Sequence, residues 1–214
     1  MKKSIFVVAF VALGMSAFAQ HVTPLNIRIA DLKLDSLRTL YISEPTMYRA
    51  SLEVASQMLD ESSSQLKAAK AEFKDEQAHA KEMAGSLKEA TKMTASLKKI
   101  YSQEESTLKS MQKTVEKQQR TLNGKKRLNQ ETRDNYSAML EKQQKELGYA
   151  LREVAERQRG VAELETSIQN WQSTLQNFNM EITQKAAEIT TLENQLKERT
   201  AAVKAEQKAV KNMQ

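Results

Sequence analysis

The sequence contains no cysteine, only two prolines and five glycines among 214 residues, and aromatic residues make up 5%. The absence of cysteine excludes disulfides and thiolate metal sites. Only two histidines occur, His21 and His79, so no histidine pair has metal-ligand spacing, and no glycine-rich phosphate loop is present. We therefore expect no catalytic residue, no metal site, no bound cofactor and no enzyme activity.

Long hydrophobic runs are also missing, apart from one short run near the beginning of the sequence. Lys2 and Lys3 precede nine apolar residues at 5–13, and Ala17, Phe18 and Ala19 then form a small-x-small cleavage site. The run is too short for a membrane span of about 20 residues. We predict a signal peptide at 1–19, cleavage after Ala19, a periplasmic or secreted protein, and no transmembrane span after cleavage. The alternative is an uncleaved N-terminal anchor.

What the sequence does contain is a seven-residue repeat of apolar residues in two long rows. The first row has one polar member and consists of Leu52, Leu59, Leu66, Phe73, Ala80, Leu87, Thr94, Tyr101, Leu108, Val115 and Leu122. The second row has none and consists of Leu140, Leu147, Val154, Val161, Ile168, Leu175, Ile182, Ile189, Leu196, Val203 and Val210. A repeat held this long predicts supercoiled α-helices, because helices with about 3.6 residues per turn must underwind to keep one seam facing a partner. We expect an all-α fold.

The second seam position of each heptad is less regular. If the rows are a positions, the d positions of the first row are Ala55, Ser62, Ala69, Glu76, Met83, Ala90, Leu97, Glu104, Met111 and Gln118. Those of the second row include Ala150, Leu164, Trp171, Phe178, Leu192 and Met213, interrupted by Arg157, Lys185 and Arg199. Apolar residues outside both seams, Met58, Met93, Ile100 and Leu151, indicate either further helices packed alongside or isolated surface positions.

Residues 123–129 separate the two rows and predict a turn. Asn123 and Gly124 form a turn dipeptide, Gly124 suits a left-handed conformation after a helix, and Asn129 can cap the next helix. Before the first row, Ser43 offers a capping hydroxyl and Pro45 is tolerated in a first turn. We predict a long antiparallel coiled-coil helical hairpin, with helices at 44–122 and 130–214, a basic loop at 123–129, and arms of roughly 115–125 Å.

A continuous helix is the competing interpretation. Leu122 and Leu140 are eighteen residues apart, which is two heptads plus four, and a four-residue insertion is a stutter that a single coiled coil accommodates. We favour the hairpin because glycine inside a helix costs about 1 kcal/mol.

The register of the hairpin is predicted from opposing small and large residues. If the numbers of facing residues add up to 251, Ala80 lies against Trp171, Phe73 against Phe178 and Leu87 against Leu164. A register displaced by one heptad places Ala80 opposite Phe178 and is the alternative.

Residues 20–43 form an N-terminal leader or docking segment of different character. Leu25, Ile27 and Ile29 alternate with polar residues, which predicts a strand or an extended arm, or a leader that simply packs onto the helices. Leu32, Leu37, Leu40 and Tyr41 then suit a short helix. We expect a short extended and helical leader.

Positive charge is concentrated between residues 113 and 133. This segment has a net charge of +5, from Glu116, Glu131 and the cationic residues Lys113, Lys117, Arg120, Lys125, Lys126, Arg127 and Arg133. Without Lys2 and Lys3 the whole chain has a net charge of +4, so the remainder sums to −1. We predict that the basic residues bind an anionic surface such as acidic lipid or polysaccharide. The alternative is a solvated turn, and nucleic acid is not expected because no aromatic stacking platform accompanies the lysines.

These features favour a non-enzymatic coiled-coil spacer, scaffold or adaptor in the cell envelope, with envelope proteins or further copies of itself as partners. The signal peptide, basic charge and long helical arms also resemble the general layout of Skp-type periplasmic chaperones. That resemblance implies a holdase for unfolded envelope proteins. The arms are longer here, and only Leu25, Ile27 and Ile29 have the alternation that the strands of that family's body require. An isolated hairpin of the efflux-adaptor type is a third interpretation, although no β-rich flanking domain is encoded.

Overall fold

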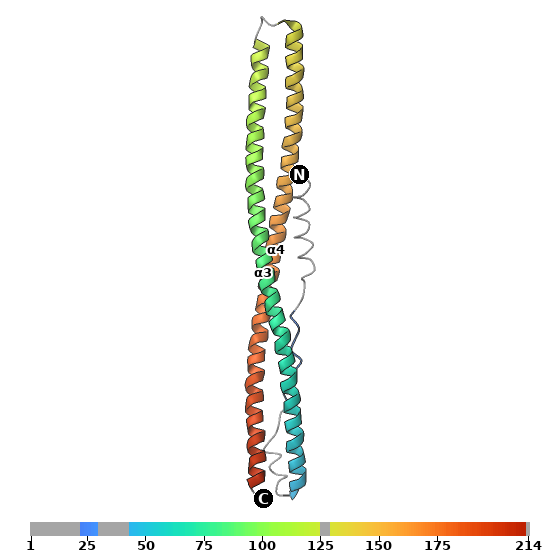
Figure 1. Cartoon of the computed structure of the whole chain (residues 1–214), viewed down its shortest axis with the longest axis vertical. Helices are drawn as coiled ribbons and strands as arrows, with labels where there is room; N and C mark the ends of the chain where they lie inside the picture. The colour runs from blue at the N-terminus through green and yellow to red at the C-terminus, as the bar shows by residue number, and fades with distance from the viewer. Residues whose placement is uncertain (1–21, 30–42, 125–128, 213–214) are drawn as a thin grey trace. The chain divides into compact units, whose positions relative to one another are not determined.

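The computed structural model describes residues 22–29, 43–124 and 129–212. Helix α3 spans Pro45–Gly124 and helix α4 spans Gln130–Asn212. The two helices pack against each other in antiparallel directions (Figure 1), and the described residues contain no strand. The prediction of an all-α helical hairpin is confirmed, and the alternative of one continuous helix is wrong.

The helix ends follow local sequence signals, with two differences. Asn129 caps α4 as predicted, since its Oδ1 accepts the backbone N–H of Glu131 at 3.0 Å. Glu44, and not Ser43, occupies the N-cap position of α3, because its carbonyl accepts the first helical bond from the N–H of Tyr48. The expected left-handed Gly124 is also wrong, because α3 continues through this residue with a negative φ.

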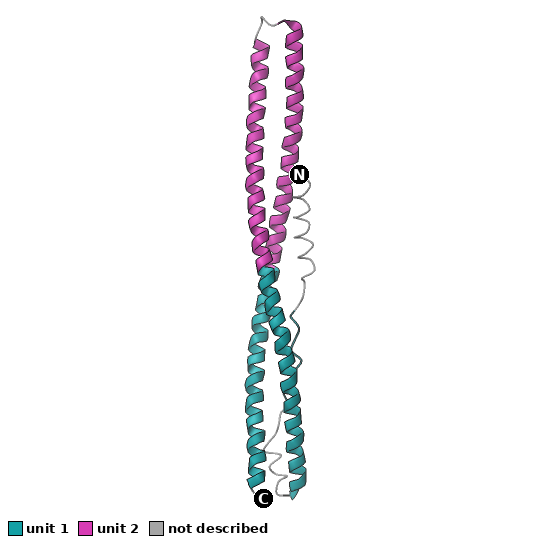
Figure 2. Cartoon of the chain, in the orientation of Figure 1, with its two compact units in different colours: residues 1–84, 174–214 teal, residues 85–173 magenta. Residues whose placement is uncertain are grey.

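The chain divides into two compact units (Figure 2), each of which contains one part of α3 and one part of α4. Unit 1 consists of residues 1–84 and 174–214, and unit 2 of residues 85–173. Within each unit the apolar rows form the core. Every member of both rows is buried or half-buried, Thr94 included. This is the burial that a heptad seam requires.

The register differs from the predicted one. The numbers of the ion-paired residues add up to 261 for Glu76 with Lys185 and to 263 for Lys98 with Glu165. Leu59 and Val203, whose numbers add up to 262, share one core cluster. The predicted sum of 251 and its one-heptad alternative are therefore wrong. Both predicted registers placed an a position opposite a d position. In the structure a positions face a positions and d positions face d positions, so that the two continuous apolar rows meet.

The seam shifts near the end of α3. Met111 and Gln118, expected at d positions, are exposed, whereas their neighbours Gln112 and Gln119 are half-buried. The shift follows from helix geometry, because a straight helix drifts by about 20° per heptad relative to an exact seven-residue repeat. Of the off-seam apolar residues, Leu151 is half-buried and three are exposed: Met58, Met93 and Ile100.

Residues 22–29 are extended but form no strand, so the strand interpretation is wrong. Leu25, Ile27 and Ile29 are half-buried and the residues between them are exposed, as the alternation indicated. Ile29 packs against the cluster of Ala55, Leu59 and Val203 in unit 1. The short helix expected around Leu32, Leu37, Leu40 and Tyr41 lies outside the described residues.

Candidate functional site

Four of the seven basic residues predicted to form a site lie at the last turns of α3 and the first turns of α4, in unit 2. Lys113, Lys117 and Arg120 are exposed on α3, and Arg133 is half-buried on α4. The spacing of the first three, i, i+4 and i+7, places them on one face of the helix. Three further members, Lys125, Lys126 and Arg127, lie outside the described residues.

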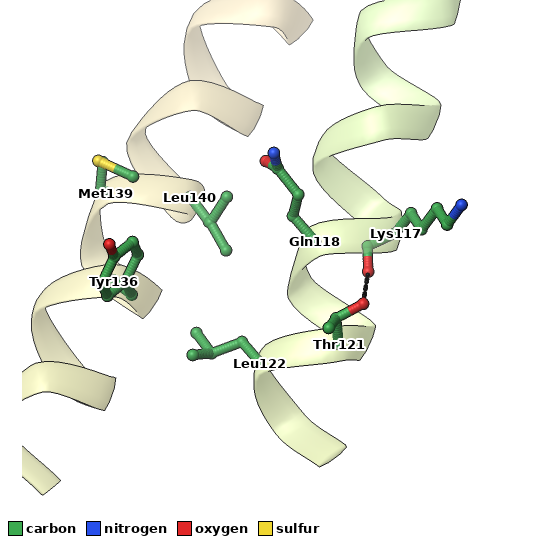
Figure 3. Close-up of a pocket in the computed structure, with 7 residues that line it drawn as sticks. All are labelled: Lys117, Gln118, Thr121, Leu122, Tyr136, Met139 and Leu140. Carbon is green, nitrogen blue, oxygen red and sulfur yellow. Dashed lines mark hydrogen bonds between the residues drawn. The ribbon is translucent and has the colours of Figure 1, made fainter. Parts of the chain in front are cut away.

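A surface pocket of about 450 Å³ lies between the two helices at this end (Figure 3). The residues that line it are Lys117, Gln118, Thr121, Leu122, Tyr136, Met139 and Leu140. Leu122 and Leu140 point into it from opposite helices and are buried, whereas Tyr136 and Met139 remain 52% and 47% exposed. The ammonium group of Lys117 points away from the pocket (Figure 3). The surface at this end therefore combines an apolar hollow with outward-pointing cations.

The pocket rests on a well-packed part of the seam. Leu122 and Leu140 belong to a core cluster with Val115 and Leu147, against which Leu108 packs. All of these residues are row members, so the heptad repeat that forms the hairpin also fixes the floor of the pocket. The exposed residues around it are held in place by α-helical backbone on both sides.

Sequence reasoning identified the basic residues at this end but missed the apolar ones. Tyr136, Met139 and Leu140 have the i, i+3, i+4 spacing of an apolar helix face, within an otherwise polar first part of α4. That spacing is a signal that could have found them. It was hidden because Leu140 is the first member of the seam row, whereas Tyr136 and Met139 precede that row within the predicted helix at 130–214.

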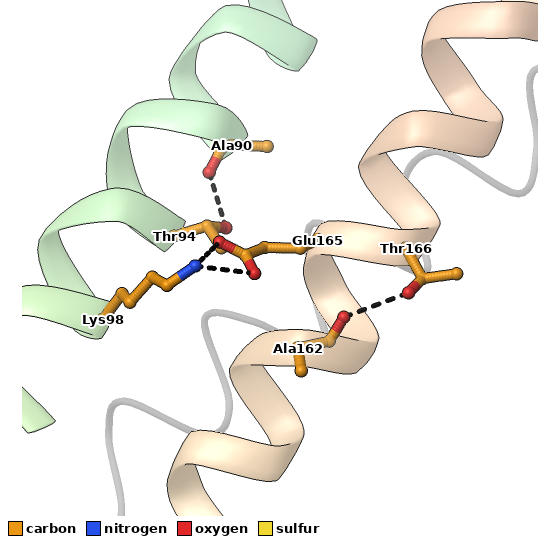
Figure 4. A network of polar contacts seen from close by, with 6 residues as sticks. All are labelled: Ala90, Thr94, Lys98, Ala162, Glu165 and Thr166. Carbon is orange, nitrogen blue, oxygen red and sulfur yellow. Dashed lines mark hydrogen bonds and ion pairs between the residues drawn. The ribbon is translucent and has the colours of Figure 1, made fainter. Parts of the chain in front are cut away.

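In unit 2 some polar contacts join the two helices and others stay within α3. Lys98 Nζ lies 2.8 and 3.0 Å from the two carboxylate oxygens of Glu165 (Figure 4). Thr94, the polar member of the first row, donates its hydroxyl hydrogen to the carbonyl of Ala90 at 2.8 Å (Figure 4). The buried hydroxyl is thus satisfied within its own helix and needs no partner on α4.

Glu105 gives unit 2 a predicted dependence on pH. A hydrogen bond from Lys109, a second from Gln158 on α4 and the charge of Lys109 lower the pKa of Glu105 from its ordinary value of 4.5. A lowered pKa stabilises the fold above pH 4.5, and this stabilisation is lost as the pH falls through the lowered value. We expect native protein to be more stable to urea than Glu105→Gln at neutral pH and equally stable in stronger acid. A difference that persists in acid would contradict this assignment.

The side chains of the basic residues and of the pocket described at this end are cationic, apolar and neutral polar groups. Among the residues that the structure describes, no three His, Cys, Asp or Glu side chains are grouped so that they could hold a metal ion. No helix within the described ranges is long and apolar enough to cross a membrane. No family model, curated protein or solved structure matches this chain.

Proposed function

We propose that this protein is a non-enzymatic, exported coiled-coil spacer or scaffold of the cell envelope that contacts an acidic lipid surface through its hairpin end. The observation that carries this proposal is the exposed basic face of Lys113, Lys117 and Arg120 next to an apolar pocket at the same end of the helices. A basic residue near acidic headgroups contributes about 1 kcal/mol of binding free energy.

The apolar residues favour a lipid surface over a polysaccharide. Tyr136 and Met139 are half-exposed at the pocket rim, and an aromatic ring with a polar tip suits the boundary between headgroups and acyl chains. A polysaccharide offers anionic groups but no acyl region into which these side chains could insert. The continuous seam supports the scaffold role, because burial of both rows holds the two helices together within each unit.

Binding to vesicles that contain phosphatidylglycerol tests the proposal. We expect a variant with Lys113→Glu, Lys117→Glu and Arg120→Glu to bind about 100-fold more weakly, since three lost cations remove about 3 kcal/mol or more. The matched control reverses three exposed lysines with the same spacing in unit 1, Lys204, Lys208 and Lys211. We expect the control to bind like native protein.

Two results would contradict the proposal: native-like binding of the unit 2 variant, or an equal loss in both variants. The apolar contribution is separated by a Tyr136→Ser, Met139→Ser variant. It should bind anionic vesicles more weakly and a soluble anionic polysaccharide as native protein does.

A second candidate function is that of a holdase chaperone, which one observation favours. Six of the seven methionines within the described residues are exposed: Met47, Met58, Met93, Met111, Met139 and Met180. Methionine side chains are flexible and polarizable, so they adapt to apolar partners of varied shape. Suppression of aggregation of a denatured membrane protein would support a holdase, whereas selective capture of one folded envelope protein would support the scaffold.

A further inference from the structure

The described part of the leader, residues 22–29, is held on unit 1 largely through its backbone. The N–H of Val22 donates to Glu181 Oε2 at 3.2 Å, and the N–H of Thr23 donates to Glu76 Oε1 at 2.9 Å. At the other end of the segment, Arg199 donates to the carbonyl of Ile29 at 2.7 Å. These contacts recognise backbone groups, which every extended polypeptide offers.

The direction of the segment follows from these contacts. Glu181 and Arg199 both lie on α4, eighteen residues apart, which is about 27 Å along a helix. The seven steps from residue 22 to residue 29 cover about 23 Å in an extended chain. The segment (blue in Figure 1) is therefore close to fully extended and runs in the direction of α4, with long side chains closing the difference.

Side-chain burial along the segment alternates. Leu25, Ile27 and Ile29 are half-buried, whereas Pro24, Asn26 and Arg28 are exposed. Ile29 packs against the cluster of Ala55, Leu59 and Val203. Pro24 supports the extended form, because proline fixes its own φ and disfavours a helical conformation of the preceding residue.

The Glu76 carboxylate, which accepts the N–H of Thr23, is held in position by Lys185 on the other helix. Lys185 Nζ lies 2.8 Å from both carboxylate oxygens of Glu76, and this pair sits in the seam, with side chains 4% and 15% exposed. Lys185 thus fixes the carboxylate that accepts the N–H of Thr23. The surface beneath the segment therefore has carboxylates at one end, and a guanidinium and an apolar cluster at the other end. We name it the leader site, defined by Glu76, Glu181, Arg199 and the Ala55, Leu59 and Val203 cluster.

We propose that the leader site binds extended polypeptide segments with apolar residues at alternate positions, and that residues 22–29 occupy it as an intramolecular ligand. A segment from another polypeptide binds with the same direction, its first N–H groups at Glu181 and Glu76 and a later carbonyl at Arg199. The side chains at alternate positions of the bound segment make binding selective, whereas the backbone contacts allow segments of different sequence to bind. This site lies in unit 1 and is independent of the basic residues of unit 2.

The test uses the full chain with a weakened leader, Leu25→Ser, Ile27→Ser and Ile29→Ser. The probe is a fluorescent, N-acetylated peptide with the sequence of residues 22–29. We expect it to bind this variant about tenfold or more tightly than native protein, because a tethered segment competes at an effective concentration of about millimolar. A peptide of equal composition in which the leucine and the two isoleucines are adjacent should bind at least about tenfold more weakly, since only alternate side chains of an extended segment face the helices.

Two further variants test whether the peptide binds at the leader site. Adding Glu181→Gln and Arg199→Gln to the weakened-leader variant should reduce peptide binding, whereas adding Lys98→Met in unit 2 should not. Equal binding of both peptides, or no binding by a variant with native helix content, would overturn the proposal.

Native protein gives a second measurement that does not depend on a variant. Excess peptide should speed hydrogen exchange of the Val22 and Thr23 amides, because it displaces the leader from Glu181 and Glu76. Unchanged exchange at saturating peptide would equally overturn the proposal.

Discussion

Replacing Glu76 with leucine should lower the free energy of unfolding by about 3–5 kcal/mol, because Lys185 then stays buried without its counter-charge. The ammonium group of Lys185 makes two hydrogen bonds to Glu76 and its side chain is 4% exposed. Lys185→Met should cost a similar amount, since it leaves the Glu76 carboxylate in the seam. Urea unfolding followed by far-ultraviolet circular dichroism measures both effects.

The double variant Glu76→Leu, Lys185→Met removes both charges together, so it shows how stable the fold is without the ion pair. We expect its stability to return to the native value or to exceed it by about 1–4 kcal/mol, because well-packed apolar residues avoid the desolvation of both charges. The matched control is Lys98→Met, which breaks a pair between the same residue types whose side chains are 62% and 40% exposed. That variant should lose no more than about 1 kcal/mol. Equal losses at the buried and exposed pairs would contradict this account of the seam.

Leu59→Ala should have the second-largest effect, a loss of about 2–5 kcal/mol of stability. Leu59 is 2% exposed and lies in a cluster with Ala55 and Val203, so truncation removes buried methyl groups and leaves a cavity. Its chain neighbour Met58 is 46% exposed, and Met58→Ala should change stability by no more than about 0.5 kcal/mol. Similar losses at the two positions would show that the heptad row does not form the core.

The helices could be predicted from the sequence because their signals are local and repeated. Each heptad contributes one apolar residue, so a single irregular position such as Thr94 did not obscure the pattern. Pro45 and Asn129 marked the beginnings of the helices through their own backbone chemistry. Gly124 was less informative, because glycine permits a left-handed conformation without requiring it.

The register depends on which residues meet across the seam, and packing size alone did not determine it. The stronger signal was charge at the polar d positions. Those of the first row include Glu76 and Glu104, and those of the second include Lys185 and Arg157. A single register brings both oppositely charged pairs together, and it is the one that the structure has. Charges drawn out of solvent need partners, and the Glu76–Lys185 pair is the more buried of the two, so these exceptions to the apolar pattern specify the register more sharply than the apolar residues do.

The candidate site was only partly predictable for a similar reason. Exposure of Lys113, Lys117 and Arg120 follows from their positions outside the apolar row. The pocket between Tyr136, Met139 and Leu122 requires the register and the packing of two helices, which no local pattern encodes. The contacts of Val22 and Thr23 with Glu181 and Glu76 join residues more than fifty positions apart and were equally hidden.

The most direct test of the hairpin is a distance between spin labels on cysteines introduced at Gln65 and Lys197, which are exposed positions of unit 1 in a chain without native cysteine. The numbers of these residues add up to 262, as in the observed register. We predict a separation below about 30 Å, because packed helix axes lie about 8–10 Å apart and each label adds several ångström. The distance should persist when labelled protein is diluted with unlabelled protein. A separation near 200 Å, as in an uninterrupted helix of about 1.5 Å per residue, or a short distance that disappears on dilution, would contradict the intramolecular hairpin.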